Sequence, residues 1–311
     1  MGNSNASTQN DRMPNFLIIG AARSGTSSLY EYMNQHPDIF FSANKEPLFF
    51  AFDGDKVDFK GPGDNRQVNI KTVTELASYQ DLFSHVTTEK AIGEASADYL
   101  YAEKAPECIH HYIPDAKLVA VLRNPVERAY SSFLYTIRDD REPLRDFAEA
   151  LAQEDERVAA HWEYIWHYRR MGYYYQHLSR YYRLFNRSQI RIYLNEDLRQ
   201  DTLSVLRDAF AFLEVDDTFK PDISIAYNEG GFPRRKLLNR LLTRQSRFKS
   251  FLRPFMPAFI MKNYIQLKYK NLDKPELSGE LKLELARAYK DDILKLQDLI
   301  QKDLSSWLHE V

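Results

Sequence analysis

Short runs of apolar residues alternate along this chain with stretches in which apolar residues recur at helical spacing. Apolar or alternating runs predict buried strands over 16–19, within 89–101, over 118–122 and over 189–194. Amphipathic stretches predict helices from Thr26, over 108–112, 126–138, 202–213 and about 280–301, and residues 143–185 are predicted to be mostly helical with a break at Gly172. Strands that alternate with helices indicate an α/β protein with a central, mostly parallel sheet flanked by helices.

No internal repeat and no long linker divides the chain. We therefore predict a single domain over residues 14–311, with helical insertions and C-terminal helices, after a disordered tail over residues 1–13. Residues 51–75 are polar and contain Gly61-Pro62-Gly63, which predicts a loop.

The composition excludes several classes of protein. The 311 residues are 44% hydrophobic and 28% charged, which excludes collagen-like and wholly disordered chains. The single cysteine, Cys108, excludes an intrachain disulfide and favours a reducing compartment. No apolar run approaches the ~20 residues of a membrane span, and the polar N-terminus lacks the apolar region of a signal peptide. We therefore expect a cytoplasmic protein without a transmembrane segment, and the sequence carries no signal for its oligomeric state.

One segment is strongly basic, although the net charge of the chain is only −2. Residues 231–270 contain eleven Lys or Arg and no Asp or Glu. Such a segment is either the solvated face of helices or a surface that meets an anionic acceptor or carrier, a membrane surface or nucleic acid. No other feature favours nucleic acid, so we expect no nucleic-acid partner.

A glycine-containing loop follows the first predicted strand. Its sequence, Gly20-Ala21-Ala22-Arg23-Ser24-Gly25-Thr26-Ser27-Ser28, has the Gly-x-x-x-x-Gly spacing of a phosphate-binding loop. A helix N-terminus offers N–H groups and a positive dipole end to an anion, and Gly25 allows the backbone to approach closely. The segment therefore predicts an anion site in a P-loop-like domain.

The cations of this region depart from the pattern of a nucleotide kinase. Thr26 stands where a kinase has Lys, and the cation Arg23 lies inside the loop. The strand over 118–122 is followed by Arg123, where a kinase usually has a magnesium-holding Asp. These features favour an anionic donor handled without a metal, and no ligand spacing indicates a metal site. A P-loop small-molecule kinase and a non-enzymatic nucleotide-binding protein remain alternatives.

Two separated segments resemble a known family. Residues 16–29, FLIIGAARSGTSSL, resemble the 5′-phosphosulfate loop of sulfotransferases that use 3′-phosphoadenosine-5′-phosphosulfate (PAPS), and residues 118–133, LVAVLRNPVERAYSSF, resemble their 3′-phosphate-binding strand and helix. His36-Pro37, KEPLFF over 45–50 and GEASADY over 93–99 resemble segments of the branch that includes heparan sulfate and many bacterial sulfotransferases. Residues 171–174 and 193–198 follow in the expected order, and the resemblance covers roughly residues 15–235.

The resemblance implies how the donor is bound. Arg23, Ser24, Gly25, Thr26, Ser27 and Ser28 would hold the 5′-phosphosulfate, and Arg23, where the family often has Lys, would neutralise charge on the leaving group. Arg123 and Ser131 would bind the 3′-phosphate. Gly231, Phe232 and Arg234 match, more loosely, a late loop that folds over the adenine and 3′-phosphate.

The resemblance also implies a general base. Transfer of a sulfuryl group to a hydroxyl requires removal of the acceptor proton, and Glu46 matches the glutamate that this branch uses. Desolvation beside Pro47 and the aromatic run would raise the pKa of Glu46 toward working pH. Lys45 either stabilises the transferred sulfuryl charge or is simply exposed. Tyr99 and Tyr173 are candidates for acceptor contact.

The sequence therefore predicts a PAPS-dependent sulfotransferase that acts by metal-independent in-line transfer, with 3′,5′-adenosine bisphosphate (PAP) as product. The predicted acceptor is a hydroxyl, or a nitrogen, of a small molecule such as a secondary metabolite. A carbohydrate acceptor is the alternative within the same family.

Overall fold

The computed structural model describes residues 12–42, 44–224, 231–235 and 270–308. These residues divide into two compact units, which we describe separately. Unit 1 comprises residues up to 58, 67–122 and 177–221, and unit 2 comprises 59–66, 123–176 and the described residues from 222 onward. The predicted single domain over 14–311 stays a prediction, and most of the predicted tail over 1–13 and of the basic segment lies outside the described residues.

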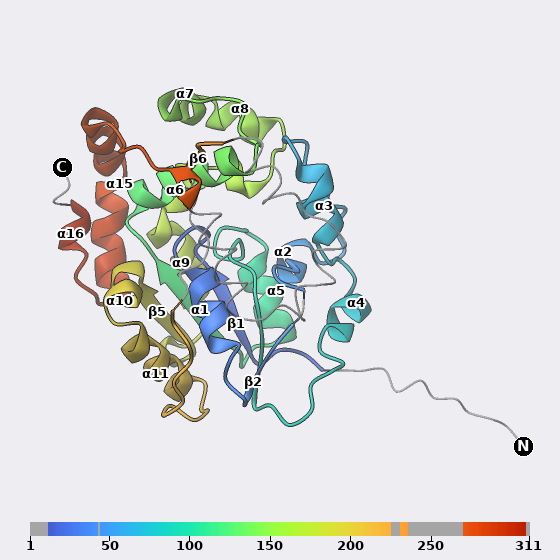
Figure 1. Cartoon of the computed structure of the whole chain (residues 1–311). Helices are drawn as coiled ribbons and strands as arrows, with labels where there is room; N and C mark the ends of the chain where they lie inside the picture. Colours follow the sequence, from blue (N-terminus) through green and yellow to red (C-terminus); the bar gives the residue numbers. More distant parts are fainter. Residues whose placement is uncertain (1–11, 43, 225–230, 236–269, 309–311) are drawn as a thin grey trace, which may run out of the picture. The chain divides into compact units, whose positions relative to one another are not determined.

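Unit 1 is built on a five-stranded, all-parallel sheet with the order β2-β3-β1-β4-β5 (Figure 1). The strands are β1 (Phe16–Gly20), β2 (Ile39–Phe41), β3 (Ala91–Ala95), β4 (Lys117–Leu122) and β5 (Ile190–Leu194). All of β1 and all but the first residue of β4 are buried, as expected for the central strands of a sheet covered on both faces. The α/β class and the mostly parallel sheet are thus confirmed.

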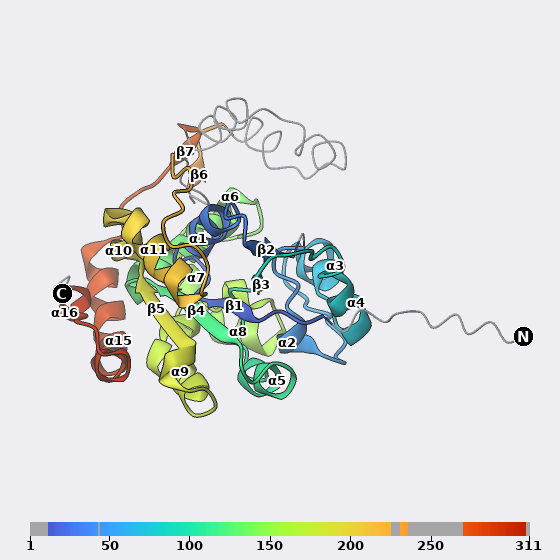
Figure 2. The same cartoon turned by 90° about the horizontal axis from the view of Figure 1, so that it is seen from below.

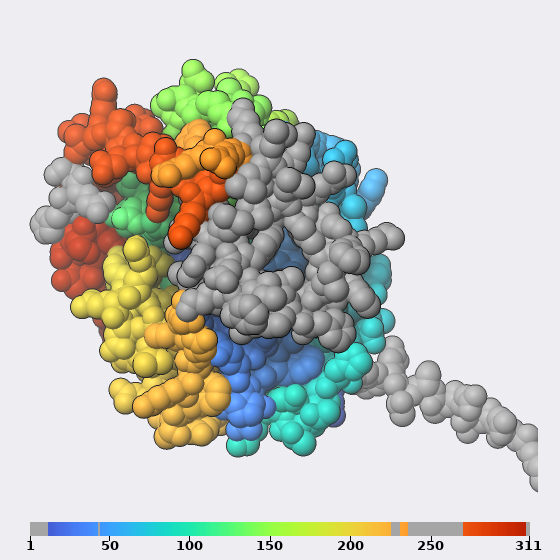
Figure 3. Space-filling view, viewed as in Figure 1, coloured from blue at the N-terminus to red at the C-terminus, as the bar shows by residue number. Residues whose placement is uncertain are grey.

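Helices cover both faces of this sheet. Those of unit 1 are α1 (Thr26–Met33), α2 (Phe49–Phe52), α3 (Val68–Lys71), α4 (Leu76–Asp81), α5 (Ala105–Tyr112), α10 (Asn195–Gln200) and α11 (Thr202–Phe212), with a 3₁₀ turn over Arg187–Gln189. Figure 2 shows α1 and α11 on one face and α5 on the other. The connection from β1 to β2 through α1 and the connection from β3 to β4 through α5 run in opposite directions along the sheet, so right-handed crossovers place these two helices on opposite faces. Figure 3 shows α11, in gold, at the surface, next to the residues of the first strands and helices, in blue.

The lone cysteine lies on α5 and is buried. Cys108 is 9% exposed, and its Sγ lies 4.0 Å from Oδ2 of Asp53. Tyr112 donates a 2.9 Å hydrogen bond to the same carboxylate oxygen. Asp53 directly follows α2, so its carboxylate connects the end of α2 to two side chains of α5.

Unit 2 is largely helical. Its elements are α6 (Pro125–Arg138), α7 (Phe147–Ala152), α8 (Glu154–Ala159), a short ribbon of β6 (Phe232–Pro233) and β7 (Leu272–Asp273), α15 (Gly279–Ile300), α16 (Ser305–Leu308) and 3₁₀ turns over Asp64–Arg66, Tyr164–Trp166 and Arg170–Gly172. Helix α9 (Tyr174–Tyr182) contributes to both units. The apolar stripe of α15 faces the interior, with Leu285, Tyr289, Ile293 and Leu296 buried and Ile300 half-buried.

One stretch differs from the prediction, because residues 51–75 contain α3, a 3₁₀ turn and the end of α2 as well as loops. Residues 143–185 are mostly helical as predicted, in several short helices. A 3₁₀ turn ends at Gly172, as the predicted break requires, and close packing explains the glycine, since a Cβ at this position would lie 2.7 Å from the hydroxyl oxygen of Tyr289. The strand β2 and the helices α4 and α10 were not predicted.

Candidate functional site

The loop between β1 and α1 is fixed at both ends. The N–H of Ala21 donates to the carbonyl of Val121 in β4, at 2.8 Å. Nδ2 of Asn195, the first residue of α10, donates to the carbonyl of Ser24, also at 2.8 Å. The loop therefore lies at the carboxyl edge of the sheet, where open α/β sheets bind ligands.

The N-terminus of α1 is suited to an anion. Its N-cap residue is Gly25, which has no side chain to cap the helix, and helix N-termini with such caps commonly bind anions. Ser24 is fully buried, and within the described residues its hydroxyl has no hydrogen-bond partner. A buried hydroxyl without a partner is costly, and a phosphate or sulfate oxygen would supply the missing acceptor.

Two cations accompany this helix end. Arg23 lies in the loop with a left-handed backbone, φ 69°. Nζ of Lys45 donates to Oγ of Ser27 at 2.8 Å and lies 5.1 Å from the ring centroid of Tyr30. A cation beside the positive end of a helix dipole is unfavourable unless an anion is bound there. The ammonium of Lys45 therefore lies beside the loop, and its role in stabilising the transferred sulfuryl charge stays a prediction.

Glu46 lies beside the carboxyl end of β3. Its backbone is left-handed, φ 59°, and its N–H donates to the carbonyl of Ala95 at 3.1 Å. Its side chain is exposed in this structure. The expected desolvation of Glu46 is therefore not found, because the neighbouring Pro47 and the aromatic run are buried without covering its carboxylate.

Tyr99 follows β3 and lies in the interior of unit 1. It is fully buried, and its hydroxyl accepts a 3.3 Å hydrogen bond from the N–H of Phe50. Burial, followed by the charge of Glu94, raises the pKa of Tyr99 well above its usual value. The phenol thus supports the segment that follows Glu46, and its contact with an acceptor stays a prediction.

The residues predicted to bind the 3′-phosphate lie in unit 2. Arg123 directly follows β4, and its Nε and Nη2 donate to Oε2 of Glu127 at 2.8 and 2.5 Å. The guanidinium side chain is 15% exposed and its partner 43% exposed. Ser131, two turns along α6, is 8% exposed. A phosphate at Arg123 would compete with this i,i+4 ion pair, which is weak at a surface.

The late loop docks on the same helix. The N–H of Gly231 donates to the carbonyl of Leu134 at 3.2 Å, and the rings of Phe232 and Phe133 lie 6.1 Å apart. Arg234 is held at the ribbon, where its N–H donates to the carbonyl of Asn271 at 2.8 Å. The structure therefore brings Gly231 and Phe232 to α6, which also carries Ser131.

Tyr173 lies apart from that group, on another part of unit 2. It is half-buried, and its ring centroid lies 5.1 Å from that of Tyr289 on α15. The role of Tyr173 in acceptor binding stays a prediction.

Asn195 is a functional candidate that the sequence reasoning missed. Its contact with Ser24 joins residues 171 positions apart in the chain. It also lies against Gly25, where an added Cβ would be 2.8 Å from Nδ2 of Asn195. The only sequence signal was its place in the stretch 193–198 that follows the family order.

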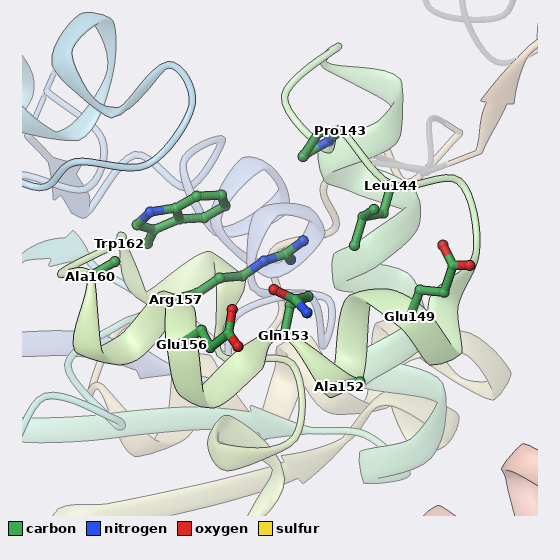
Figure 4. Close-up of a pocket in the computed structure, with 9 residues that line it drawn as sticks. All are labelled: Pro143, Leu144, Glu149, Ala152, Gln153, Glu156, Arg157, Ala160 and Trp162. Carbon is green, nitrogen blue, oxygen red and sulfur yellow. The ribbon is translucent and has the colours of Figure 1, made fainter.

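Unit 2 also has a hollow of about 530 Å³ beside α7 and α8 (Figure 4). It is lined by Pro143, Leu144, Glu149, Ala152, Gln153, Glu156, Arg157, Ala160 and Trp162. None of the predicted site residues lines it. Arg157 is already engaged there, because it donates two hydrogen bonds, of 2.8 and 2.9 Å, to Glu142.

Two absences hold for the part of the chain that the structure describes. In the described ranges, no three or more His, Cys, Asp and Glu side chains are grouped so that they could hold a metal ion. Among the same residues, no helix combines the length and apolarity needed to cross a membrane.

Comparison with known proteins connects this chain to curated enzymes. It is 26% identical over 314 residues to the mouse bifunctional heparan sulfate N-deacetylase/N-sulfotransferase 4, which covers 96% of this chain and 32% of that protein. It is 30% identical over 190 residues to the human heparan sulfate glucosamine 3-O-sulfotransferase 6, which covers 61% of this chain and 49% of that protein. The chain thus spans about a third to a half of the length of these relatives.

A solved structure matches over nearly the whole length of both chains. The crystal structure of a sulfotransferase from Alicyclobacillus acidocaldarius is 35% identical, with a TM-score of 0.75, and the match covers 95% of this chain and 99% of that one. A family model described as "Sulfotransferase family" matches residues 14–219. Because this model covers more than half of the chain, the chain belongs to the sulfotransferase family.

Proposed function

We propose that this protein transfers a sulfuryl group from PAPS to a hydroxyl or amine of an acceptor. The observation that carries the proposal is the buried hydroxyl of Ser24, which has no hydrogen-bond partner among the described residues and lies on the loop that Lys45 contacts through Ser27. This arrangement fits the phosphosulfate end of the donor.

The proposed donor contacts follow the family pattern. Residues 23–28 hold the 5′-phosphosulfate, and Arg123 and Ser131 hold the 3′-phosphate. Gly231, Phe232 and Arg234 lie over the adenine and the 3′-phosphate. Asn195 joins this set as the residue that fixes the carbonyl of Ser24 and so the path of the loop.

The proposed chemistry is a single in-line displacement at sulfur. The acceptor oxygen forms a bond to sulfur while the bond from sulfur to the 5′-phosphate oxygen breaks. The acceptor proton passes to the carboxylate of Glu46, and PAP leaves with an added negative charge that Arg23 and Lys45 stabilise. Most of the rate enhancement then comes from positioning and charge stabilisation, and no metal takes part.

The identity of the acceptor is the part of the proposal that the named relatives bear on. The relatives named above act on heparan sulfate, at nitrogen or at the 3-hydroxyl, as their names state. We propose a small hydroxyl-bearing metabolite, sulfated in the cytoplasm, and a carbohydrate acceptor is the alternative. A panel of small phenols, steroid alcohols and heparosan oligosaccharides, with PAP release as readout, separates the two.

The first experiment measures thermal stabilisation by PAP and by Mg–ATP. PAP at 100 times its dissociation constant is expected to add about 2.7 kcal/mol of stability, and Mg–ATP much less. Arg123→Ala is expected to lose most of the PAP effect. Arg191→Ala is the matched control, because Arg191 on β5 makes a half-exposed ion pair with Asp208 at 3.2 Å and lies over the ring of Phe212, at 5.1 Å from its centroid.

Each result separates the candidate functions. Stabilisation by PAP that Arg123→Ala removes and Arg191→Ala keeps supports the donor assignment. Stabilisation by Mg–ATP alone would contradict it and favour a kinase. Glu46→Gln is expected to keep PAP binding and lose turnover, whereas unchanged turnover would remove Glu46 from the role of base.

A further inference from the structure

The segment that carries Glu46 is tied to the end of β3 by three hydrogen bonds. The N–H of Glu46 donates to the carbonyl of Ala95 at 3.1 Å, and the N–H of Leu48 donates to Oγ of Ser96, also at 3.1 Å. The N–H of Phe50 donates to the hydroxyl of Tyr99 at 3.3 Å. Every second residue of the segment 46–50 is therefore anchored on residues 95–99.

One of these anchoring residues, Ser96, is itself bonded to a buried carboxylate. Glu94 is 1% exposed, and Oγ of Ser96 donates to its Oε2 at 2.9 Å. The hydroxyl of Tyr79 on α4 donates to its Oε1 at 3.3 Å. Because Ser96 has only one hydroxyl proton, a proton directed to Glu94 leaves its lone pairs to accept from Leu48. Glu94 thus orients the hydroxyl of Ser96 so that its oxygen can accept the hydrogen bond from the N–H of Leu48.

The anchored segment needs this support. Glu46 and Leu48 both have left-handed backbones, with φ 59° and 57°. This conformation costs a non-glycine residue roughly 1–2 kcal/mol, so it persists only where surrounding contacts impose it. A buried carboxyl is itself unfavourable unless its hydrogen bonds are satisfied. The chain therefore buries the carboxyl of Glu94, at a cost in stability, next to the residue that anchors the segment of the proposed base.

We propose that Glu94 is a positioning residue for sulfuryl transfer, which acts through Ser96 to hold segment 46–50 so that Glu46 keeps one orientation at the loop. The inference rests on the proposed role of Glu46 as base. It assigns Glu94 no contact with donor or acceptor, since its side chain is buried among Tyr79, Ser96 and Tyr99.

The test compares three changes in the full chain. Glu94→Ala and Ser96→Ala remove the support, and Glu94→Gln keeps an oxygen that can accept from Ser96. Tyr79→Phe is the control, because it removes the longer 3.3 Å bond and leaves the bond from Ser96. Amide hydrogen exchange over 46–50 and over 21–28 is measured, together with PAP release from PAPS using p-nitrophenol, heparosan oligosaccharide or water as acceptor.

The expected results are local. Glu94→Ala and Ser96→Ala speed exchange over 46–50 and leave residues 21–28 and the PAP affinity unchanged. With the acceptor that turns over best, kcat falls by roughly tenfold to a hundredfold, while KM for PAPS stays within about twofold. Glu94→Gln and Tyr79→Phe stay within about threefold of the wild type.

A double-mutant cycle with Glu46→Gln tests whether Glu94 acts through the base. If it does, Glu94→Ala costs little further activity once Glu46 is changed. If the losses of activity from Glu94→Ala and Glu46→Gln are additive, the proposal is overturned. Unchanged amide exchange over 46–50 in Glu94→Ala would also overturn it, even if Glu46→Gln is inactive. If Glu46→Gln keeps full turnover, the proposed base fails instead, and the exchange result still reports on the support by Glu94.

Discussion

At the scale of single residues, Glu94 combines burial with an unusual protonation equilibrium. Desolvation is the main cause that raises its pKa to about 7, repulsion from Glu46 adds to it, and hydrogen bonds from Tyr99, Ser96 and Tyr79 oppose it. Near neutral pH the carboxyl is therefore close to its midpoint in the folded protein. In the unfolded chain it ionises near its ordinary value of about 4.3.

This difference predicts how Glu94 affects stability. Between about pH 4.5 and pH 7 the folded state binds more protons at Glu94 than the unfolded state, so its contribution to stability falls as pH rises. Glu94→Gln is expected to gain stability relative to the wild type from pH 5 to pH 8, measured by urea denaturation. Parallel pH profiles for the two proteins would contradict the assignment.

The sequence could not reveal this role. Glu94 lies in GEASADY, which matched the family as a strand, and the sequence pattern does not distinguish a buried glutamate from an exposed one. The same holds for Tyr99, whose hydroxyl was expected to reach an acceptor. Both side chains are placed by contacts with residues 46–50 and with α4, which are distant in sequence.

At the scale of elements, the pairs β1–α1 and β4–α6 were predictable, because short apolar runs end at Gly20 and before Pro125. The strand β2 was not, since three residues give no readable alternation. Helix α10 begins directly after β5 without a turn signal, so the contribution of Asn195 to the loop was also hidden.

The connection between β1 and α1 gives a prediction with a matched pair of glycines. Gly25 and Gly54 both have positive φ, 109° and 71°, but a Cβ at Gly54 would meet nothing within 4 Å. Gly54→Ala is expected to cost about 1–2 kcal/mol in urea denaturation. Gly25→Ala is expected to cost more and to weaken PAP binding, because its Cβ would displace Asn195 from the carbonyl of Ser24.

Equal destabilisation by the two glycine substitutions would contradict this account. So would unchanged PAP affinity in Gly25→Ala, measured by isothermal titration. The Gly54→Ala variant controls for the strain of a left-handed backbone alone.

At the scale of the whole molecule, the fold class was the most predictable property, because alternation of strands and helices extends along most of the chain. The two compact units were not anticipated, since no linker marks a boundary between them. Unit 2 is assembled from segments around residues 59–66, 123–176 and the C-terminal helices, and such assembly depends on contacts that no local pattern encodes.

The proposed donor contacts lie in two separate stretches of the chain, 23–28 and 123–131, which predicts that both stretches respond to PAP. Amide exchange is expected to slow over residues 21–28 and also over 123–131 when PAP is added, and not when Mg–ATP is added. Protection confined to residues 21–28 would remove Arg123 and Ser131 from the donor site while leaving the loop assignment intact.

The environment of Cys108 has a practical consequence. Burial, with a contribution from Asp53, raises the pKa of its thiol to about 11, so little of the reactive thiolate exists at neutral pH. A maleimide can then label the native protein only when the region around α5 opens. Because the chain has a single cysteine, the rate of maleimide labelling would measure how often the region around α5 opens. Local unfolding can therefore be followed in the native sequence, without an engineered residue.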